Sequence, residues 1–247
     1  LGAVIRGIGR SKIRLGIIPA GTENDIAASL GIPDDLKQAC ALIASGHTRK
    51  LDVGVINTKK QKDYYFFMVS TIGLTASIYP PVSEVPEGKL AGIKDAVITF
   101  LKYKTDPTVF LTLDDESKIE VKTMLVTIAN TPVIGIKNLV APDASLEDGL
   151  LDIAVYPGFT KAELINYFLK TAHEGAIADE RIQRYQARKI KVKTSPKLDV
   201  AAEGIIMGKG SARIKVLKQA LWVIAPEPGT GAEKPHKETV AETAEPV

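Results

Sequence analysis

One stretch, Leu15 to Pro33 (LGIIPAGTENDIAASLGIP), constrains the fold of this chain more than any other. Its apolar start, Leu15 to Ile18, contains no polar side chain, which is typical of a strand covered on both faces. Pro19-Ala20-Gly21 then predicts a tight turn, and the apolar residues that follow recur at the spacing of a helix. A buried strand that leads through a turn into a helix is typical of an α/β layer.

The start of that helix has two interpretations. Thr22 is predicted to cap it, with Asp25 completing a pair like a capping box, and Gly31 ends it. A capped helix after a strand explains these residues without any ligand. The alternative is a phosphate site, because free amides at a helix N-terminus attract phosphate, and the carboxylate of Asp25, next to Asn24, could hold Mg²⁺ over it.

Charge and cysteine content exclude several classes of protein. The chain has 247 residues and a net charge of +3, which is too small to argue for nucleic acid but compatible with an anionic membrane surface. The single cysteine, Cys40, excludes an internal disulfide and fits a reducing compartment, and its apolar helical surroundings predict a core position. The longest nearly apolar run, Tyr64 to Leu74, is too short to span a bilayer. We therefore expect a cytoplasmic protein without a transmembrane segment.

The beginning of the chain predicts helices around the first stretch. Leu1 to Gly9 has the pattern of a helix end with a glycine-rich exit, and Asp34-Asp35 that of an acidic helix start. Because Leu1 already lies inside an apolar pattern, we expect an N-terminal piece to be missing from this sequence. Residues 1–48 are therefore predicted to be the C-terminal part of an α/β domain.

The pattern changes to strands from Arg49 onward. Residues 49–57 (RKLDVGVIN) alternate, which predicts a half-buried strand with Asp52 facing outward. Tyr64 to Leu74 predicts a second, more buried strand, and Lys59 to Lys62 a solvated hairpin tip between the two. Further strands are predicted at 108–113, 119–129, 150–156, 182–194, 198–202, 212–216 and 220–224, and helices at 90–104 and after Thr160.

Many short strands with few helices predict an antiparallel β-sandwich for residues 49–226. Packing of its last strands against the first domain is compatible with this prediction. The acidic turn at 114–116 is interpreted as a hairpin tip rather than a metal site, because no other ligand converges on it. Residues 227–247 consist mostly of small, charged and proline residues and are predicted to form a disordered tail. The predicted fold class is α/β plus all-β: the remnant of an α/β domain followed by an antiparallel β-sandwich domain.

Three stretches resemble the family of diacylglycerol kinase- and sphingosine kinase-like lipid kinases. PAGTENDIAASLGIP is similar to the family's P-x-G-T-x-N-D-F-A-R-x-L-G-I-P signature, with Ile26 and Ala28 as departures. RKLDVGVIN resembles its R-x-I-D-L-G segment. IANTPVIGIKNLVAPDASLEDGLLDI follows its A-N-x-P-x-x-G-G-x-x-x-A-P-D-A-x-x-D-D-G-x-L-D pattern, with Ile136 and Lys137 departing. The resemblance extends over residues 13–225.

This resemblance implies an α/β nucleotide-binding domain, a β-sandwich domain and an active site in the cleft between them. It implies that Gly21, Thr22 and Asn24 contact ATP, and that Asp25 takes a catalytic part in a network of Mg²⁺ and water. The family's G-G-D-G-T loop, which carries much of its ATP site, has no counterpart in these 247 residues.

The resemblance also implies a metal site in the D-G-L-L-D segment. Its ligands would be the Asp148 side chain and the backbone carbonyls of Ser145 and Leu150. Carboxylate and carbonyl oxygens completed by water suit Mg²⁺ or another hard cation. Taken without the resemblance, the same segment is a glycine turn that enters a strand.

The family's general base is the Glu of a D-G-E segment near the C-terminus. An ungapped comparison with VAAEGIIMGKGSARIKV places Glu203 on the Asp, Gly204 on the Gly and Ile205 on the Glu. A lipid hydroxyl gains from a nearby carboxylate that accepts its proton. Since the base position is apolar, Glu203, one methylene longer than Asp, is the candidate catalytic residue.

We therefore expect an ATP-dependent lipid kinase that transfers the γ-phosphate to the hydroxyl of diacylglycerol or a similar lipid, with ATP and Mg²⁺ as cofactors. It would meet its lipid substrate at the membrane surface, in peripheral contact with the inner membrane face. The alternative is a non-catalytic lipid- or nucleotide-binding relative that lacks G-G-D-G-T and the D-G-E base. NAD kinases are disfavoured because the quoted motifs are those of lipid kinases. Nucleic acid is not expected as a partner, and a homodimer is left open.

Overall fold

The computed structural model describes residues 2–8, 11–21, 24–74, 107–134, 138–139, 141–175 and 177–228. Its helices and strands in chain order are α1 (Gly2–Ile8), β1 (Arg14–Leu15), α2 (Asp25–Ser29), α3 (Leu36–Ser45), β2 (Thr48–Asn57), β3 (Tyr64–Phe66), β4 (Val69–Gly73), β5 (Thr108–Leu113), β6 (Ser117–Ala129), β7 (Val133–Ile134), β8 (Asn138–Leu139), β9 (Leu151–Pro157), α6 (Lys161–Glu174), β10 (Gln183–Ala187), β11 (Lys189–Ser195), β12 (Asp199–Ala202), β13 (Ile205–Lys209) and β14 (Ser211–Ile224). The helix predicted at 90–104 and nearly all of the predicted tail lie outside the described residues.

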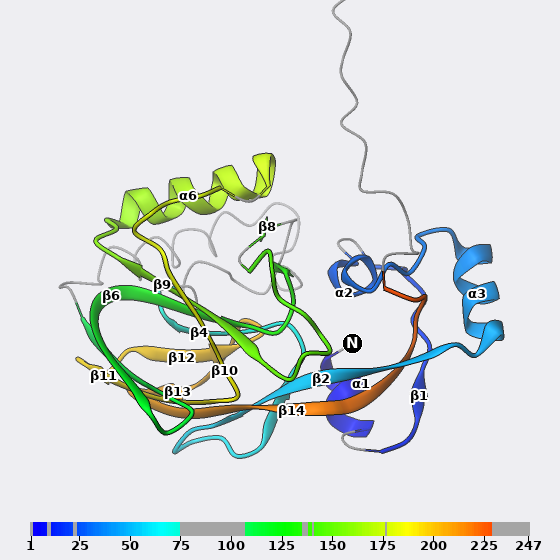
Figure 1. Ribbon diagram of the computed structural model, residues 1–247, viewed down its shortest axis with the longest axis horizontal. Helices are drawn as coiled ribbons and strands as arrows, with labels where there is room; N and C mark the ends of the chain where they lie inside the picture. The colour runs from blue at the N-terminus through cyan, green and yellow to red at the C-terminus, as the bar shows by residue number, and fades with distance from the viewer. Residues whose placement is uncertain are drawn as a thin grey trace, which may run out of the picture.

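Most strands belong to one antiparallel sheet that folds into two layers (Figure 1). One layer has the order β6-β5-β11-β14-β2-β3, and the other contains β13, β12, β4, β9 and β10. The long strand β6 belongs to both layers, because residues 117–122 pair with β5 whereas residues 123–129 pair with β4 and β9. This arrangement, with helices at one end, confirms the predicted combination of an α/β part with an antiparallel β-sandwich.

Apolar side chains that alternate along the strands fill the space between the layers. The main core cluster includes Ile56, Leu111, Ile128, Ile153 and Ile190, which are all less than 2% exposed. The predicted strand at 108–113 is confirmed with both of its ends.

Helix α6 covers the outer side of the second layer (Figure 1). The Tyr156 ring on β9 lies 6.0 Å from the ring of Phe159 and 5.9 Å from that of Tyr167, both edge to face. The predicted cap at Thr160 is confirmed as a capping box, since Thr160 Oγ1 accepts from the Glu163 amide and the Glu163 carboxylate accepts from the Thr160 amide.

The other helices gather at one end of the sheet, beside the ends of β2 and β14 (Figure 1). Strand β1 joins them there by pairing in parallel with Trp222 and Val223 of β14. No helix among the described residues has both the length and the apolarity needed to cross a bilayer. The predicted domain division between residues 48 and 49 stays a prediction.

The first stretch differs from its prediction at both the strand and the cap. The strand is reduced to Arg14–Leu15, and β14 is the only strand that pairs with it among the described residues. Because this strand lies at an edge and is short, the predicted strand residue Ile18 is 46% exposed. The helix begins after Asn24, which adopts a left-handed conformation with φ 51°, so Asn24 and not Thr22 is the N-cap. Thr22 itself lies outside the described residues.

The predicted core position of Cys40 is wrong, since this residue is exposed. Helix α3 is fully buried only at Ala39, and Leu36 at its start is 61% exposed. The apolar spacing of a helix therefore identified α3 but not which of its side chains are covered.

Two predicted strands are each divided where the chain passes from one layer to the other. Tyr64 to Leu74 is interrupted at Phe67 and Met68, which leaves β3 in the first layer and β4 in the second. Residues 182–194 divide in the same way into β10 and β11 at Arg188. Conversely, the strands predicted at 212–216 and 220–224 are one strand, β14, with an irregularity between Leu217 and Leu221.

Candidate functional site

Three of the segments singled out from the sequence surround one group of buried side chains, here called the junction core. Helix α2, the 141–150 loop and the link between β3 and β4 each contribute to it, together with α1 and the ends of β2 and β14. Its members are Ile5, Ala27, Leu30, Ile32, Leu51, Val53, Phe67, Leu146, Leu221, Val223 and Ala225. The junction core is where the helices meet the sandwich.

Asp52 lies at the centre of this region and was missed as a functional residue. The alternation in β2 predicted an outward carboxylate, but Asp52 is 0% exposed. Its Oδ2 accepts from the Gly149 amide at 2.6 Å, and its Oδ1 from the Gln219 amide at 2.7 Å. Its own amide donates to the Leu146 carbonyl at 2.7 Å. The residue therefore fastens the 141–150 loop and β14 to β2.

The charge on Asp52 is costly in this position. Removal from water raises the pKa of Asp52, while the amides of Gln219 and Gly149 oppose the rise and the neighbouring carboxylate of Asp148 adds to it. Removal from water likewise raises the pKa of Asp152, with the Asp148 carboxylate again contributing. The carboxylates around the 141–150 loop thus influence one another, while Lys218, which donates to the Asp148 carbonyl at 3.4 Å, and Arg49, which pairs with Glu147, bring positive charge to the same loop.

The 141–150 loop contains the three residues of the predicted metal site. The Leu150 amide donates to Asp148 Oδ1 at 2.8 Å, which makes a tight turn, and the Glu147 amide donates to the Ser145 hydroxyl. Gly149 within the turn has φ 80°, which favours glycine. No group of three or more acidic, histidine or cysteine side chains suited to a metal occurs in the described part of the chain. One carboxylate with backbone carbonyls offers oxygen ligands of the kind that a hard cation takes together with several waters, although Lys218 Nζ lies 3.4 Å from the Asp148 carbonyl.

Glu203 occupies a two-residue turn between β12 and β13. Both Glu203 and Gly204 have positive φ, 49° and 77°, as a type I′ hairpin requires. Glu203 Oε1 accepts from the Phe67 amide at 2.8 Å and from the Met68 amide at 3.4 Å, where β3 gives way to β4. Its carboxylate therefore satisfies the backbone at a point where the chain leaves one layer for the other.

The second carboxylate oxygen of Glu203 faces helix α1. Arg6 Nη1 lies 3.7 Å from Glu203 Oε2 and donates to the Tyr64 hydroxyl at 2.9 Å. The Glu203 side chain is 18% exposed. Oε2 is thus the oxygen of this carboxylate that is not hydrogen-bonded to the backbone.

Ile205, which the ungapped motif comparison predicts to stand at the position of the family's base, is 49% exposed, and Ile206 beside it is 46% exposed. Glu203 remains the acidic residue of this turn.

Asn130 connects the Asp52 region with the Glu203 turn. Its Nδ2 donates to the Asp52 carbonyl at 3.1 Å and to the Phe67 carbonyl at 2.9 Å, and its amide donates to the Met68 carbonyl. Its Oδ1 is buried and has no hydrogen-bond partner among the described residues. The available signal in the sequence was a short polar residue directly after a long apolar strand.

The predicted nucleotide residues lie at the start of α2. Asn24 Oδ1 accepts from the Gly21 amide at 2.9 Å, which closes the turn before the helix. Asp25 is the first residue of a helix whose Ala27 is buried in the junction core. The structure therefore places this turn beside the junction core, and Thr22 is outside the described residues.

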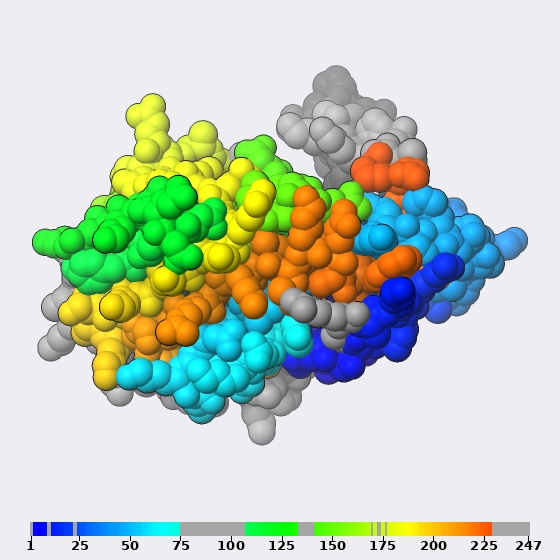
Figure 2. All heavy atoms as spheres, turned by 60° about the horizontal axis from the view of Figure 1, so that its bottom comes forward, coloured from blue at the N-terminus to red at the C-terminus, as the bar shows by residue number. Residues whose placement is uncertain are grey.

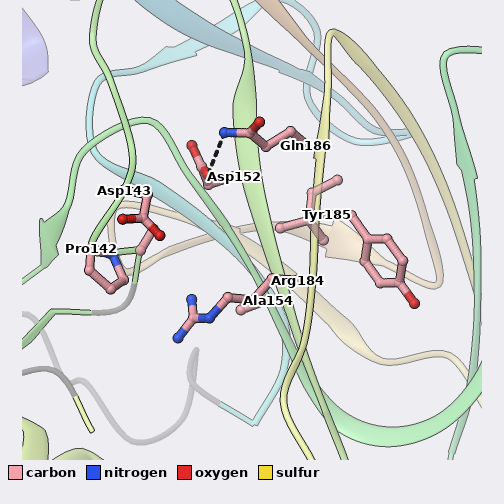
Figure 3. Close-up of a pocket in the computed structure, with 9 residues that line it drawn as sticks. Pro142, Asp143, Asp152, Ala154, Arg184, Tyr185 and Gln186 are labelled. Carbon is pink, nitrogen blue, oxygen red and sulfur yellow. Dashed lines mark hydrogen bonds between the residues drawn. The ribbon is translucent and has the colours of Figure 1, made fainter. Parts of the chain in front are cut away.

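A hollow of about 360 Å³ lies between the start of the 141–150 loop and strands β9 and β10 (Figure 3). Asp143 from the loop, Asp152 from β9 and Arg184 from β10 point toward the same space, whereas the Tyr185 ring points away. The Gln186 side-chain Nε2 donates to Asp152 Oδ1 at 3.0 Å. The lining carries charges of both signs beside apolar residues from the loop and β9.

Two known families match this sequence. Residues 82–225 match the YegS C-terminal NAD kinase beta sandwich-like domain, and residues 1–56 match the diacylglycerol kinase catalytic domain. Together the matches cover the α/β part and most of the sandwich.

Individual relatives agree with this assignment. A diacylglycerol kinase of Bacillus subtilis is 30% identical over 86% of this chain and 69% of its own length. An uncharacterized protein of Synechocystis is 27% identical over 87% of this chain, which spans half of that relative's length. A crystal structure of a diacylglycerol kinase from Bacillus anthracis has the same fold, with a TM-score of 0.61 and 22% identity over 87% of this chain and 67% of the other. The chain described here belongs to the family of diacylglycerol kinase-like lipid kinases.

Proposed function

We propose that this protein is an ATP-dependent kinase that transfers the γ-phosphate of ATP to the hydroxyl of diacylglycerol or a similar lipid. The observation that carries the proposal is the path of hydrogen bonds from the 141–150 loop through Asp52 and Asn130 to Phe67 and Glu203. This path holds the candidate cation loop and the candidate base in fixed relation to each other, as phosphoryl transfer requires of its positioning groups.

The remaining roles follow from the chemistry of each group. Gly21, Thr22 and Asn24 would contact ATP, and Asp25 would orient water around its magnesium ion. When bound, Mg²⁺ neutralises charge that develops on the phosphates during transfer. A second cation at Asp148, with the carbonyls of Ser145 and Leu150, would stabilise the loop that Asp52 holds.

Glu203 is the proposed proton acceptor, acting through Oε2. Its Oε1 is occupied by two backbone amides, which fix the direction of the carboxylate without consuming its second oxygen. The Arg6 guanidinium at 3.7 Å keeps positive charge near that oxygen. Transfer of the hydroxyl proton to Oε2 would make the lipid oxygen a stronger nucleophile as the phosphoryl group arrives.

The second candidate function is a non-catalytic lipid- or nucleotide-binding protein. Two points support it: the motif comparison aligns Ile205 with the family's base, and the Glu203 carboxylate accepts from the Phe67 amide where the chain crosses between the layers. In this alternative Glu203 only holds the turn.

The two candidates differ in the response to Glu203→Gln. A glutamine keeps an oxygen for the Phe67 amide but is no base. In the protein as its gene encodes it, we expect this variant to phosphorylate dioleoylglycerol about 10²–10⁴-fold more slowly, with an unchanged melting temperature. Glu116→Gln, in an exposed turn, is the matched control and should be neutral.

Glu203→Ala separates the structural contribution, because it should also lower the melting temperature through the loss of the amide contacts. A Glu203→Gln variant with full kinase activity would remove Glu203 as the base. If the parent protein phosphorylates no lipid yet binds MgATP or lipid, the non-catalytic alternative is the correct one.

The site of action is part of the proposal. Diacylglycerol resides in bilayers, so we place the protein in the cytoplasm in peripheral contact with the inner membrane face. A homodimer remains a separate hypothesis.

A further inference from the structure

One surface of the sandwich is strongly basic and is not used by the proposed reaction. It is formed by the outward side chains of the first half of β6, of β5 and β11, and of the first half of β14, whose inward neighbours fill the main core. This surface, here called the basic face, contains Lys118, Lys122, Lys189, Lys191, Lys193, Arg213 and Lys215. Figure 2 shows it as the adjoining green, yellow and orange areas.

The strand register brings these cations into direct opposition. Lys189 pairs with Lys215 across β11 and β14, and Lys191 pairs with Arg213. Like charges at directly opposed positions destabilise a sheet. The fold therefore gives no reason for this pattern, and a charged partner does.

Few carboxylates offset the basic face. On its strands Glu120 is the outward acid, and the β5–β6 turn adds Asp114, Asp115 and Glu116. Asp115 contacts Lys191 and lies 3.9 Å from Lys189. The seven cations of the basic face therefore outnumber these four carboxylates, whereas the whole chain has 32 basic and 29 acidic residues.

An aromatic residue stands among these cations. Phe110 on β5 is 39% exposed and pairs with Lys193 on one side and Glu120 on the other. Helix α6 lies on the other layer, and no helix of the described ranges is seen over the basic face (Figures 1 and 2). A broad sheet surface with cations around an exposed aromatic side chain suits an interface with headgroups and a shallow apolar boundary.

We infer that the basic face docks on a bilayer that contains anionic lipid, with Phe110 entering the headgroup region. Charge complementarity favours this occupant. A symmetric contact with a second copy would bring seven cations against seven, which opposes association. The inference rests on the proposed peripheral contact with the membrane and deepens it by naming the surface that makes this contact, whereas docking itself requires neither nucleotide nor a lipid hydroxyl.

Each basic side chain near an anionic leaflet increases partitioning about fivefold. Reversing two charges changes the charge of the basic face by four units, so it should weaken vesicle binding by at least about 25-fold, the loss expected from removing two cations. Lys193 and Lys215 are suitable because they are exposed and make no ion pair that the structure shows.

The test is co-sedimentation with vesicles, without ATP or diacylglycerol. Vesicles of phosphatidylcholine are compared with vesicles containing about 30% phosphatidylglycerol, at low salt and at about 0.5 M salt. We expect binding only to the anionic vesicles, weakened by salt, and the stated loss in Lys193→Glu with Lys215→Glu. Phe110→Ser should weaken the binding severalfold and reduce the part that resists salt.

The matched control reverses two exposed lysines elsewhere, Lys37 on α3 and Lys170 on α6, to Glu. It changes net charge equally and should retain the binding of the parent within about threefold. The inference would be overturned if both double variants lost binding equally or if the folded parent did not bind. Tighter binding to duplex DNA than to anionic vesicles would also overturn it. Melting curves of all variants establish that they are folded. Lipid phosphorylation is assayed separately, so a lack of kinase activity would leave the vesicle-binding result unchanged.

Discussion

Replacing Asp52 by alanine tests how much the buried carboxylate stabilises the region around the candidate site. The change removes two short hydrogen bonds, from the amides of Gly149 and Gln219. Hydrogen bonds to a charged group are each worth about 1.5–3 kcal/mol. Part of this gain is offset, since removal from water raises the pKa of Asp52 and thereby shows that its charge is destabilised.

The net loss for Asp52→Ala should be about 2–4 kcal/mol, because two amides lose their acceptor while the buried charge disappears. For a chain of this size that corresponds to a melting temperature lower by about 4–16 °C. Asp52→Asn keeps the shape but turns an NH₂ group toward one of the two amide donors, so it should be destabilised nearly as much.

Thermal and urea unfolding of parent and variants measure these differences. Asp152→Asn is the matched control: Asp152 lies on β9 directly after the 141–150 loop, is only partly buried, and accepts one side-chain hydrogen bond from Gln186. Its loss should stay below about 1 kcal/mol. If Asp52→Ala melts within about 2 °C of the parent, the reasoning about its two amide bonds is refuted.

Two further predictions concern cation binding and pH. EDTA should lower the melting temperature of the parent and have little effect on Asp148→Ala, because a bound cation stabilises only the folded loop; equal sensitivity in both proteins would remove the site. Hydrogen bonds to the Ala225 carbonyl and then to Glu227 raise the pKa of His47 above its ordinary value of 6.5. The charged imidazole therefore stabilises the folded state below pH 6.5, and this stabilisation is lost as the pH rises through the raised pKa. An NMR titration should therefore give a lower His47 pKa in Glu227→Gln than in the parent, and an unchanged value would contradict the assignment.

Local patterns predicted the elements whose stability is itself local. The strand at 108–113 has a regular alternation, and the helix after Thr160 begins with a capping box, so neighbours in sequence decide both. The motif resemblance likewise identified the family, because its residues are contiguous in the sequence.

Predictions failed where distant residues determine the environment. Asp52 was expected outside because alternation presupposes water on one face, yet its carboxylate partners lie 97 and 167 residues away. The breaks at Phe67 and Arg188 follow from the passage between layers, which no local apolar pattern records. The base position shows a third limit: the sequence located Glu203, but only the structure shows that its Oε1 is bound to backbone amides.

The irregularity in β14 has a mechanical consequence. Strands β2 and β14 run as a paired ribbon from the sandwich to the helices, and β14 carries extra residues between Leu217 and Leu221, with Gln219 at φ 52°. The regular pairing of the two strands is interrupted at these residues, so the Gln219 amide, which donates to the Asp52 carboxylate at 2.7 Å, links β14 to β2 where the ladder itself does not.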